Sequence, residues 1–261
     1  MNCLIETALL THGLRSIANE ELAQSWHCPD AILAWVDGGE LKIGPIGEYL
    51  PFRERSEELV RIDCDHLEEA RQSRASGALT ASGTMAVCRR LDIPMAITCG
   101  MGGIGDLRGE ELCPDLPALM NIPVALISTS PKDMLDRPAT LDWLRRHGVH
   151  TAGEPCTGYL FCGEPVALEL PLSSCNNETA VRRFTANGGL LILNPIPEKE
   201  RVQDRSILVD AIKAGKQAEA EGHYYHPAAN GEIDRRTDGY SSRIQLESIQ
   251  QNYLLAKSIM D

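Results

Sequence analysis

Positive charge and long apolar runs are both scarce in this sequence. Its 261 residues carry 37 Asp and Glu against 25 Lys and Arg, a formal net charge of −12, and such a field repels nucleic acid and anionic membrane surfaces. No apolar run approaches the ~20 residues that span a bilayer. The first residues, MNCLIETALL, have no basic segment and include Glu6, which argues against a signal peptide. We expect a cytoplasmic protein without nucleic-acid or membrane partners; a small phosphorylated ligand needs only a local cationic pocket.

Paired cysteines are missing as well. The nine cysteines are an odd number at irregular spacing, with no CxxC pair and no Cys/His cluster of metal-site spacing. This pattern gives no disulfide framework and indicates reduced cytosolic thiols. The histidines, including the pair His223 and His226, show no metal-ligand spacing either. No repeat or break in composition divides the chain, so one domain over residues 1–261 is predicted.

What the sequence does contain is an alternation of short apolar runs with longer segments of helical periodicity. The runs predict strands at residues 8–10, 31–36, 41–43, 95–98, 124–127 and 189–193. The periodic segments predict helices at residues 17–26, 76–91, 140–147, 207–221 and 241–260, with a loop over 222–240. Strands that are apolar on both faces and alternate with helices favour a layered α/β sheet.

A glycine-rich motif, Gly100–Gly105, fits G-x-G-x-x-G directly after a predicted strand. In a dinucleotide site an acidic residue at the end of the next strand holds the ribose. Here that strand ends in Ser128-Thr-Ser130 and then Lys132, and residues 106–111 are too charged and glycine-broken for the packed helix that the motif opens. We therefore expect no nucleotide cofactor and a tight glycine loop that lines an active site.

Two further features each allow two interpretations. The stretch Gly77–Met85 places small and hydroxyl residues at the start of a helix, which is typical either of a phosphate site or of simple capping by Ser76. Glu6 lies at the start of a predicted strand, where it is either a general acid whose pKa is raised by burial or an exposed carboxylate. Neither pattern decides by itself.

Lys132 is unexpected because it follows the apolar run Val124–Ile127. An amine is nucleophilic only when neutral, so a catalytic lysine requires burial or a neighbouring cation that lowers its pKa. The carboxyl end of a core strand provides such a place, and ligands gather there in α/β sheets. The alternative is a lysine at a helix N-terminus whose amine reaches solvent.

Six motifs in chain order resemble one family, the pseudouridine-5'-phosphate glycosidases, also called indigoidine synthase A-like proteins. No single motif is decisive, but the six cover nearly the whole chain. They are Glu6-Thr-Ala-Leu-Leu-Thr-His-Gly13, Gly77–Met85, Gly102–Gly109, Cys113–Leu116, Pro131–Asp136 followed by Thr140–Leu144, and Leu193-Asn-Pro-Ile-Pro-Glu198.

The resemblance implies a three-layer α/β/α sandwich with a mixed, largely parallel central sheet, assembled as a homotrimer. It also implies the reversible conversion of pseudouridine 5'-phosphate and water into uracil and ribose 5-phosphate, with a divalent metal, typically Mn²⁺. The family's nucleophile, which forms a Schiff base with the sugar, corresponds to Lys132, and its proton donor corresponds to Glu6.

Other roles carry over by position. Arg61 stands where the family has a second, substrate-binding lysine, and Glu111 stands at the position of the metal-holding acid. The remaining substrate-binding positions correspond to Thr80 and Ala81 on the phosphate side, to Cys113, Pro114 and Asp115 in place of the family's S-A-D, and to Gln245 in place of an asparagine.

The sequence departs from the family around the base and the sugar. The histidine of the glycine loop has no counterpart, Cys113 replaces a serine, and the family's T-G-G-x-S-L-x-x-N becomes Asp238–Gln245. The predicted chemistry is therefore the reaction of an amine with a phosphorylated sugar or nucleotide. The sequence does not determine which heterocycle takes part. One alternative is a C-glycosynthase that joins ribose 5-phosphate to a non-uracil heterocycle in C-nucleoside biosynthesis. The other is a non-catalytic protein that binds a sugar phosphate.

Overall fold

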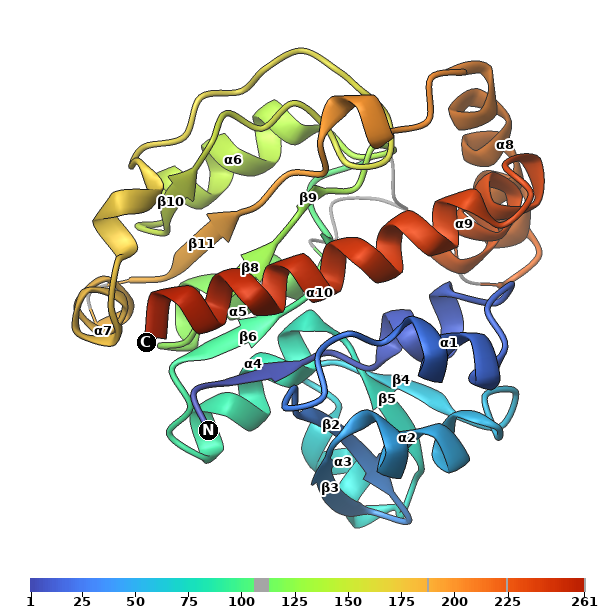
Figure 1. Cartoon of the computed structure of the whole chain (residues 1–261), viewed down its shortest axis with the longest axis horizontal. Coiled ribbons are helices and arrows are strands. Elements are labelled where there is room, and N and C mark those ends of the chain that lie inside the picture. Colours follow the sequence, from blue (N-terminus) through green and yellow to red (C-terminus); the bar gives the residue numbers. More distant parts are fainter. Residues whose placement is uncertain (106–112, 187, 224, 261) are drawn as a thin grey trace.

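The computed structural model describes residues 1–105, 113–186, 188–223 and 225–260. Figure 1 shows a central curved sheet with helices on both faces. The strand order is β10 (His150–Gly153), β11 (Leu190–Leu193), β8 (Ala125–Ser128), β6 (Met95–Ile97), β1 (Cys3–Ile5), β2 (Leu33–Asp37), β5 (Gly77–Leu79) and β4 (Val60–Ile62), with β3 (Glu40–Gly44) also paired to β2.

The pairing is mixed but largely parallel. Neighbouring strands from β10 to β2 all run parallel to one another. β3 and β5 run antiparallel to β2, and β4 lies parallel to β5. The predicted mixed, mainly parallel sheet is thus confirmed.

Two hydrophobic cores lie on opposite faces of this sheet, because successive strand side chains point to opposite sides. In β1, Leu4 belongs to one core and Ile5 to the other, and in β8 Leu126 and Ile127 divide in the same way. All four side chains are fully buried. This double burial explains why the strands are apolar without alternation.

Each core is closed by its own layer of helices. The core that contains Leu4 is covered by α3 (Leu67–Gln72), α4 (Ala81–Arg90), α5 (Asp115–Asn121) and α6 (Arg137–Arg146). The core that contains Ile5 is covered by α1 (Asn19–Ser25), α2 (Ile46–Arg53), α7 (Glu178–Ala186), α8 (Ser206–Ala220), α9 (Tyr225–Arg236) and α10 (Tyr240–Met260). The long α10 crosses the strands in Figure 1. The predicted three layers are confirmed.

Thr7, two residues after the end of β1, connects the chain to β2 and to β5 through its side chain. Its Oγ1 donates to Ala34 O at 2.9 Å and accepts from Leu79 N at 2.9 Å. Its carbonyl accepts from Thr11 N at 2.9 Å, which turns the chain into a π-helical turn, Leu9–Gly13. The predicted strand at 8–10 is therefore wrong, because the threonine hydroxyl takes over the ladder bonds that would continue β1.

Two other predicted elements differ. The helix expected from Ser76 is first a strand, β5, and then α4, whose N-cap is Thr80 rather than Ser76. The loop expected at 222–240 contains α9, which buries Tyr225, Ala229 and Ile233. These three residues are spaced four apart, so they share one helical face, but the polar residues between them hid the pattern.

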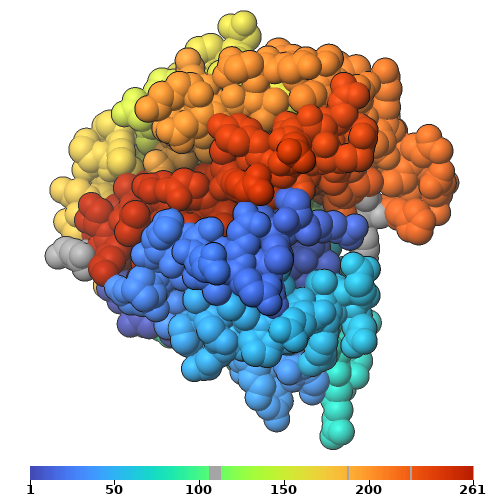
Figure 2. Space-filling model, turned by 45° about the vertical axis from the view of Figure 1, so that its right-hand side comes forward, coloured from blue at the N-terminus to red at the C-terminus, as the bar shows by residue number. Residues whose placement is uncertain are grey.

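The helices predicted at 17–26, 140–147, 207–221 and 241–260 are confirmed as α1, α6, α8 and α10. In Figure 2 the end of α8 (orange) projects from the body at the right-hand edge, above the N-terminal region (blue). None of the helices in the described ranges has the length and apolar character that a bilayer crossing requires.

Candidate active site

Three neighbouring parallel strands end at the same edge of the sheet, and each is followed by a polar residue. Glu6 follows β1, Thr98 follows β6, and Lys132 follows β8 after a short strand, β9 (Ser130–Pro131). β9 pairs in parallel with β7 (Gly100–Met101), the first part of the glycine loop. Because ligands bind at the carboxyl ends of parallel strands, this edge is where a site is expected.

A cavity of about 350 Å³ opens at this edge. It brings together six residues that the sequence placed in the site, from segments far apart along the chain. They are Arg61 in β4, Thr80 at the start of α4, Cys113, Pro114 and Asp115 at the start of α5, and Lys132 after β9. Glu6, Ala81 and Gln245 do not line this cavity, and Glu111 lies outside the described residues.

The Lys132 amine is in an environment that disfavours its charge. Burial lowers the pKa of this amine, and the nearby Arg61 guanidinium lowers it further, while Cys113, Glu6 and Asp115 act in the opposite direction. No ion pair to Lys132 is formed within the described part of the chain. A lowered pKa increases the neutral fraction of the amine, which is the form that acts as a nucleophile.

Gly100 provides the space for Lys132. A Cβ at this position would lie 3.1 Å from Lys132 Cγ and 2.7 Å from Tyr159 Cζ. Gly102 is equally confined, since a Cβ there would overlap Cys113 Sγ. The glycines of the loop therefore allow close packing of side chains around the lysine, as expected for a loop that lines the site.

Glu6 is buried beside these residues and is 7% exposed. Burial raises the pKa of its carboxyl to about 7; the Asp115 charge also raises it, whereas the hydrogen bond from Thr98 and the charges of Lys132 and Arg61 lower it. Thr98 Oγ1 donates to Glu6 Oε1 at 2.8 Å. A carboxyl with this pKa can both donate and accept a proton near neutral pH.

Asp115, the first residue of α5, binds the N-terminus of α4 through its carboxylate. Its Oδ1 accepts from Ser82 N at 3.1 Å and its Oδ2 from Gly102 N at 2.8 Å, so the carboxylate joins the helix to the glycine loop. Gly83 N donates to Thr80 Oγ1. These amides are therefore already paired, and the Ala81 side chain is buried in the core. A phosphate would meet the hydroxyls of Thr80 and Ser82 and the Arg61 guanidinium.

Gln245 is hydrogen-bonded to Tyr159, a residue that the sequence did not identify as part of the site. Tyr159 OH donates to Gln245 Oε1 at 2.8 Å and lies 3.2 Å from Cys99 Sγ. Gln245 Nε2 donates to Ser241 O within α10. Since Tyr159 packs beside Gly100 and Lys132, Gln245 fixes the wall of the site rather than lining the cavity.

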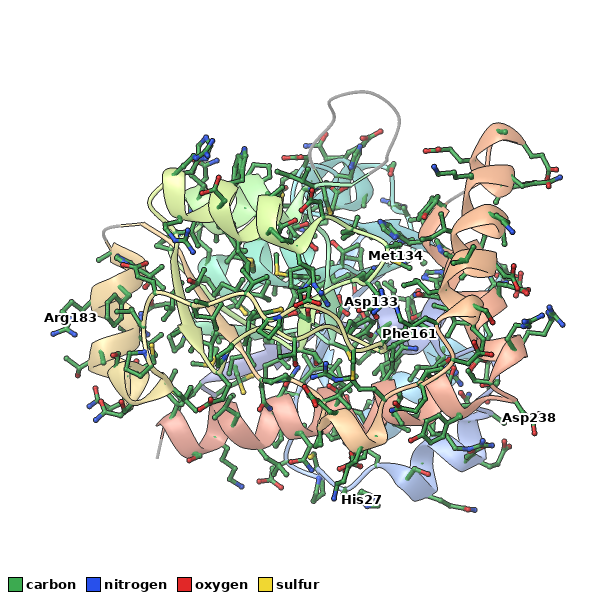
Figure 3. All side chains as sticks on the ribbon, turned by 90° about the horizontal axis from the view of Figure 1, so that it is seen from above. His27, Asp133, Met134, Phe161, Arg183 and Asp238 are labelled. Carbon is green, nitrogen blue, oxygen red and sulfur yellow. The ribbon has the colours of Figure 1, made fainter. Side chains whose placement is uncertain are left out.

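Asp133, next to the lysine, anchors the same wall. Its carboxylate accepts from the backbone N–H groups of Tyr159, Leu160 and Phe161, at 2.8, 2.7 and 3.0 Å. Figure 3 shows Asp133 and Phe161 close together in the interior. Residues 159–161 belong to no helix or strand, so no periodic signal in the sequence pointed to this contact.

The cavity is also lined by three ionisable residues that the sequence did not identify as site residues. Asp63 and His66 form a pair at its edge, with His66 Nδ1 2.7 Å from Asp63 Oδ1. This hydrogen bond raises the pKa of the His66 imidazole. His226 comes from α9, the helix that the sequence did not predict.

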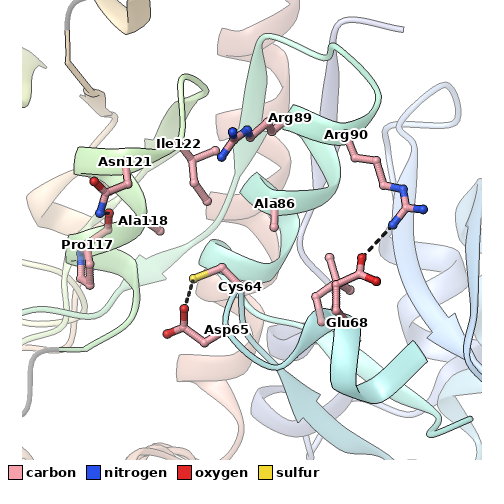
Figure 4. Close-up of a pocket in the computed structure, with 11 residues that line it drawn as sticks. Cys64, Asp65, Glu68, Ala86, Arg89, Arg90, Pro117, Ala118, Asn121 and Ile122 are labelled. Carbon is pink, nitrogen blue, oxygen red and sulfur yellow. Dashed lines mark hydrogen bonds and ion pairs between the residues drawn. The ribbon is translucent and has the colours of Figure 1, made fainter. Parts of the chain in front are cut away.

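A larger pocket of about 540 Å³ lies between α3, α4 and α5 (Figure 4). Arg90 and Glu68 form an ion pair there at 2.9 Å. Burial raises the pKa of the Cys64 thiol to about 11, so this thiol is protonated at neutral pH and a poor nucleophile. Without an activated group, this pocket is not a candidate for chemistry.

A metal site is not formed by the described residues, among which no three His, Cys, Asp or Glu side chains cluster as ligands. Glu111, the predicted metal ligand, lies outside the described ranges.

Comparison with known proteins finds similarity to one family along nearly the whole chain. The family model described as "Indigoidine synthase A like protein" matches residues 4–260. The pseudouridine-5'-phosphate glycosidase of Methylobacterium nodulans is 27% identical over 276 residues, which cover 98% of this chain and 81% of that protein. The enzyme of the same name from Petrotoga mobilis is 26% identical over 277 residues, covering 98% and 89%.

Two solved structures share the fold. The prealnumycin C-glycosynthase AlnA, in complex with ribulose 5-phosphate, superimposes with a TM-score of 0.77 at 21% identity, covering 98% of this chain and 91% of that one. An indigoidine synthase A-like protein from Thermotoga maritima gives 0.78 at 19% identity, with the same coverage.

Proposed function

Because the chain belongs to the indigoidine synthase A-like family, we propose that it cleaves or forms a C-glycosidic bond at C1' of a ribose 5-phosphate unit through Lys132. The two relatives described above are named pseudouridine-5'-phosphate glycosidases, and their similarity covers 98% of this chain. The single observation that supports the role of Lys132 is a buried amine of lowered pKa that lines the same cavity as Arg61.

The bond itself explains why an amine is needed. A C–C glycosidic bond has no heteroatom leaving group that an acid can protonate. Once the sugar ring opens and C1' is bonded to Lys132 Nζ, the nitrogen lone pair forms a C=N bond as the heterocycle leaves and is protonated at carbon. Water then hydrolyses the iminium to ribose 5-phosphate and free lysine, and formation of the bond is the reverse.

Glu6 and Arg61 have complementary roles in this proposal. Glu6 donates a proton to the ring oxygen as C1'–O4' breaks, which its pKa of about 7 permits near neutral pH. Arg61 binds the phosphate through its guanidinium fork and lowers the pKa of Lys132 by charge repulsion. Thr80 and Ser82 supply hydroxyl groups to the phosphate from the start of α4.

A second candidate is C-glycoside synthesis with a heterocycle other than uracil. Cys113 lines the cavity, and burial raises the pKa of its thiol to about 12. The site therefore presents a neutral, weakly hydrogen-bonding thiol where the family has a serine, which favours a less polar heterocycle.

Three further properties are proposed from the family resemblance. Glu111 would hold a divalent metal, Mn²⁺, the chain would form a homotrimer, and it would act in the cytoplasm. Metal analysis of the purified protein and of Glu111→Gln tests the first of these.

Borohydride trapping tests the proposed function. Wild-type protein, Lys132→Ala and the matched control Lys199→Ala, whose side chain is 83% exposed, are each incubated with ribose 5-phosphate and borohydride. Intact mass should show one reduced sugar adduct on the wild type and on Lys199→Ala, and none on Lys132→Ala.

Absence of any adduct on the wild type would overturn the amine mechanism. Binding of ribose 5-phosphate without an adduct would favour the non-catalytic alternative. If the adduct forms, incubation with pseudouridine 5'-phosphate and with a panel of heterocycles then separates the glycosidase from the synthase.

A further inference from the structure

His226 reaches the cavity from α9, a helix rather than a strand end. It lies in the first turn of α9 and lines the same cavity as Lys132 and Arg61. Its neighbour Tyr225 fixes this turn, because the Tyr225 ring packs on Gly215 of α8, where a Cβ would lie 2.7 Å from Tyr225 Cε2. The two rings, Tyr225 and His226, meet edge to face with centroids 5.4 Å apart. The position of the imidazole is thus set by the packing of α8 on α9 (Figure 1).

The imidazole is not satisfied by the protein around it. His226 Nδ1 is buried and has no hydrogen-bond partner in the described part of the chain. A buried ring nitrogen without a partner lowers stability, because it has given up its hydrogen bonds to water without replacing them. Polar groups of this kind are uncommon in folded proteins and call for a functional explanation.

The ring is also neutral at physiological pH. Burial holds the pKa of His226 well below its ordinary value, and the positive charges of Lys132 and Arg61 act in the same direction. The ionisable groups that line the cavity with it are Arg61, Asp63, His66, Cys113, Asp115 and Lys132. A neutral imidazole beside an amine nucleophile has a lone pair free to accept a proton.

We propose that His226 is the base that carries the amine proton of Lys132 while the bond from Nζ to C1 of the sugar forms. This inference rests on the proposed function and adds a catalytic residue to it. It gives a role to α9, a helix that the sequence did not predict.

The proton transfer balances for the open-chain aldehyde of ribose 5-phosphate. The Lys132 lone pair adds to C1, and the carbonyl π electrons move to oxygen. His226 accepts one N–H proton from the resulting ammonium and delivers it to that oxygen, giving a neutral carbinolamine. Glu6 then protonates the hydroxyl, which leaves as water while the nitrogen lone pair forms the iminium. Hydrolysis follows the same steps in reverse.

Trapping kinetics with chemical rescue test this role. The rate of borohydride-trapped adduct formation with ribose 5-phosphate is measured for the wild type, His226→Ala and His27→Ala, at a fixed pH with and without imidazole. His27 is exposed and lies at the outer edge of the molecule (Figure 3), so its removal should leave the rate unchanged. We expect His226→Ala to react about 100-fold more slowly and to recover in proportion to added imidazole.

Thermal unfolding of each variant checks that the fold is retained, and His226→Gln provides a second variant of similar volume. A wild-type rate in His226→Ala would overturn the inference and leave the proposed function intact. Slow reaction of both variants without imidazole rescue, at unchanged melting temperature, would also overturn it, since a structural role alone predicts that result. No adduct on the wild type would overturn the function and the inference together.

Discussion

At the residue scale, the pKa values of Glu6 and Lys132 shift toward each other. Burial disfavours the charged form of both groups, which raises the pKa of the Glu6 carboxyl and lowers that of the Lys132 amine. Their mutual attraction opposes both shifts, but burial is the larger cause for each. The Arg61 guanidinium lowers the pKa of both groups, which favours the carboxylate form of Glu6 and the neutral amine of Lys132. Burial thus increases the protonated fraction of Glu6 and the neutral fraction of Lys132, the forms in which the proposed reaction uses them.

Glu6 gives a prediction about stability and pH. Its folded pKa, about 7, lies above the ordinary 4.5, so the native state binds the proton more tightly than the unfolded chain. The stabilising contribution is present below pH 4.5 and is lost as pH rises through 7. Between pH 5 and pH 8, wild type should lose roughly 2.5 kcal/mol of unfolding free energy relative to Glu6→Gln.

Urea unfolding at the two pH values measures this difference. Glu54→Gln serves as the control because Glu54 is exposed at the end of α2, and its difference from wild type should not change with pH. If the gap between wild type and Glu6→Gln were the same at both pH values, Glu6 would not titrate in the folded protein as stated.

At the element scale, the parallel strands fix where the reactive groups meet. β1, β6 and β8 are neighbours in the sheet, so their carboxyl ends deliver Glu6, Thr98 and the β9 segment to one edge. Asp115 then holds α4 to the glycine loop. Asp133 holds residues 159–161. Buried hydrogen bonds of this kind hold the segments around the cavity in place, as a preorganised site requires.

The glycine loop gives the second prediction. Gly100→Ala should displace the Lys132 or Tyr159 side chain, because the new Cβ would lie within 3.1 Å of both. A displacement of this size should reduce the rate of adduct formation roughly 100-fold. The matched control is Gly47→Ala in α2, where a Cβ would meet nothing within 4 Å and alanine favours the helix. Equal rates in the two variants would show that this close packing is not needed.

At the scale of the whole molecule, the net negative charge of the chain differs in sign from the basic residues that line the cavity. The net charge of −12 disfavours polyanionic partners, yet the cavity joins Arg61 and Lys132 beside the hydroxyls of α4. A single phosphorylated sugar can be held by these local groups, because only charges within about 10 Å act strongly at moderate salt.

The proposed homotrimer is the prediction at this scale. Sedimentation equilibrium of the purified protein should give the mass of three 28.6-kDa chains. A monomer or dimer across the concentration range used for the trapping assay would contradict it. The same samples, assayed for adduct formation, show whether assembly and reaction change together.

Local sequence patterns determined most of the elements and the identity of the nucleophile candidate. Strands such as Val124–Ile127 are apolar because both sheet faces are covered, and that pattern can be read without a structure. Lys132 was singled out because it follows such a strand. Glu6 was placed at the start of a predicted strand, residues 8–10, that the structure does not contain, and the family resemblance supplied the proposed role of each. The exceptions are local as well: the Thr7 side chain ends β1, and the apolar face of α9 is diluted by His, Asn and Asp.

Only the tertiary structure decided which residues face one another. Strand order and crossovers bring Arg61, Lys132 and His226 to one cavity, although no sequence period links these positions. Burial, which sets the pKa of Glu6 and Lys132, depends on that assembly. The packing of Tyr225 on Gly215 directs His226 toward the site. The sequence determined which reactive residue types are present, and long-range packing decided which of them share one cavity, because contacts between distant segments form only in the folded chain.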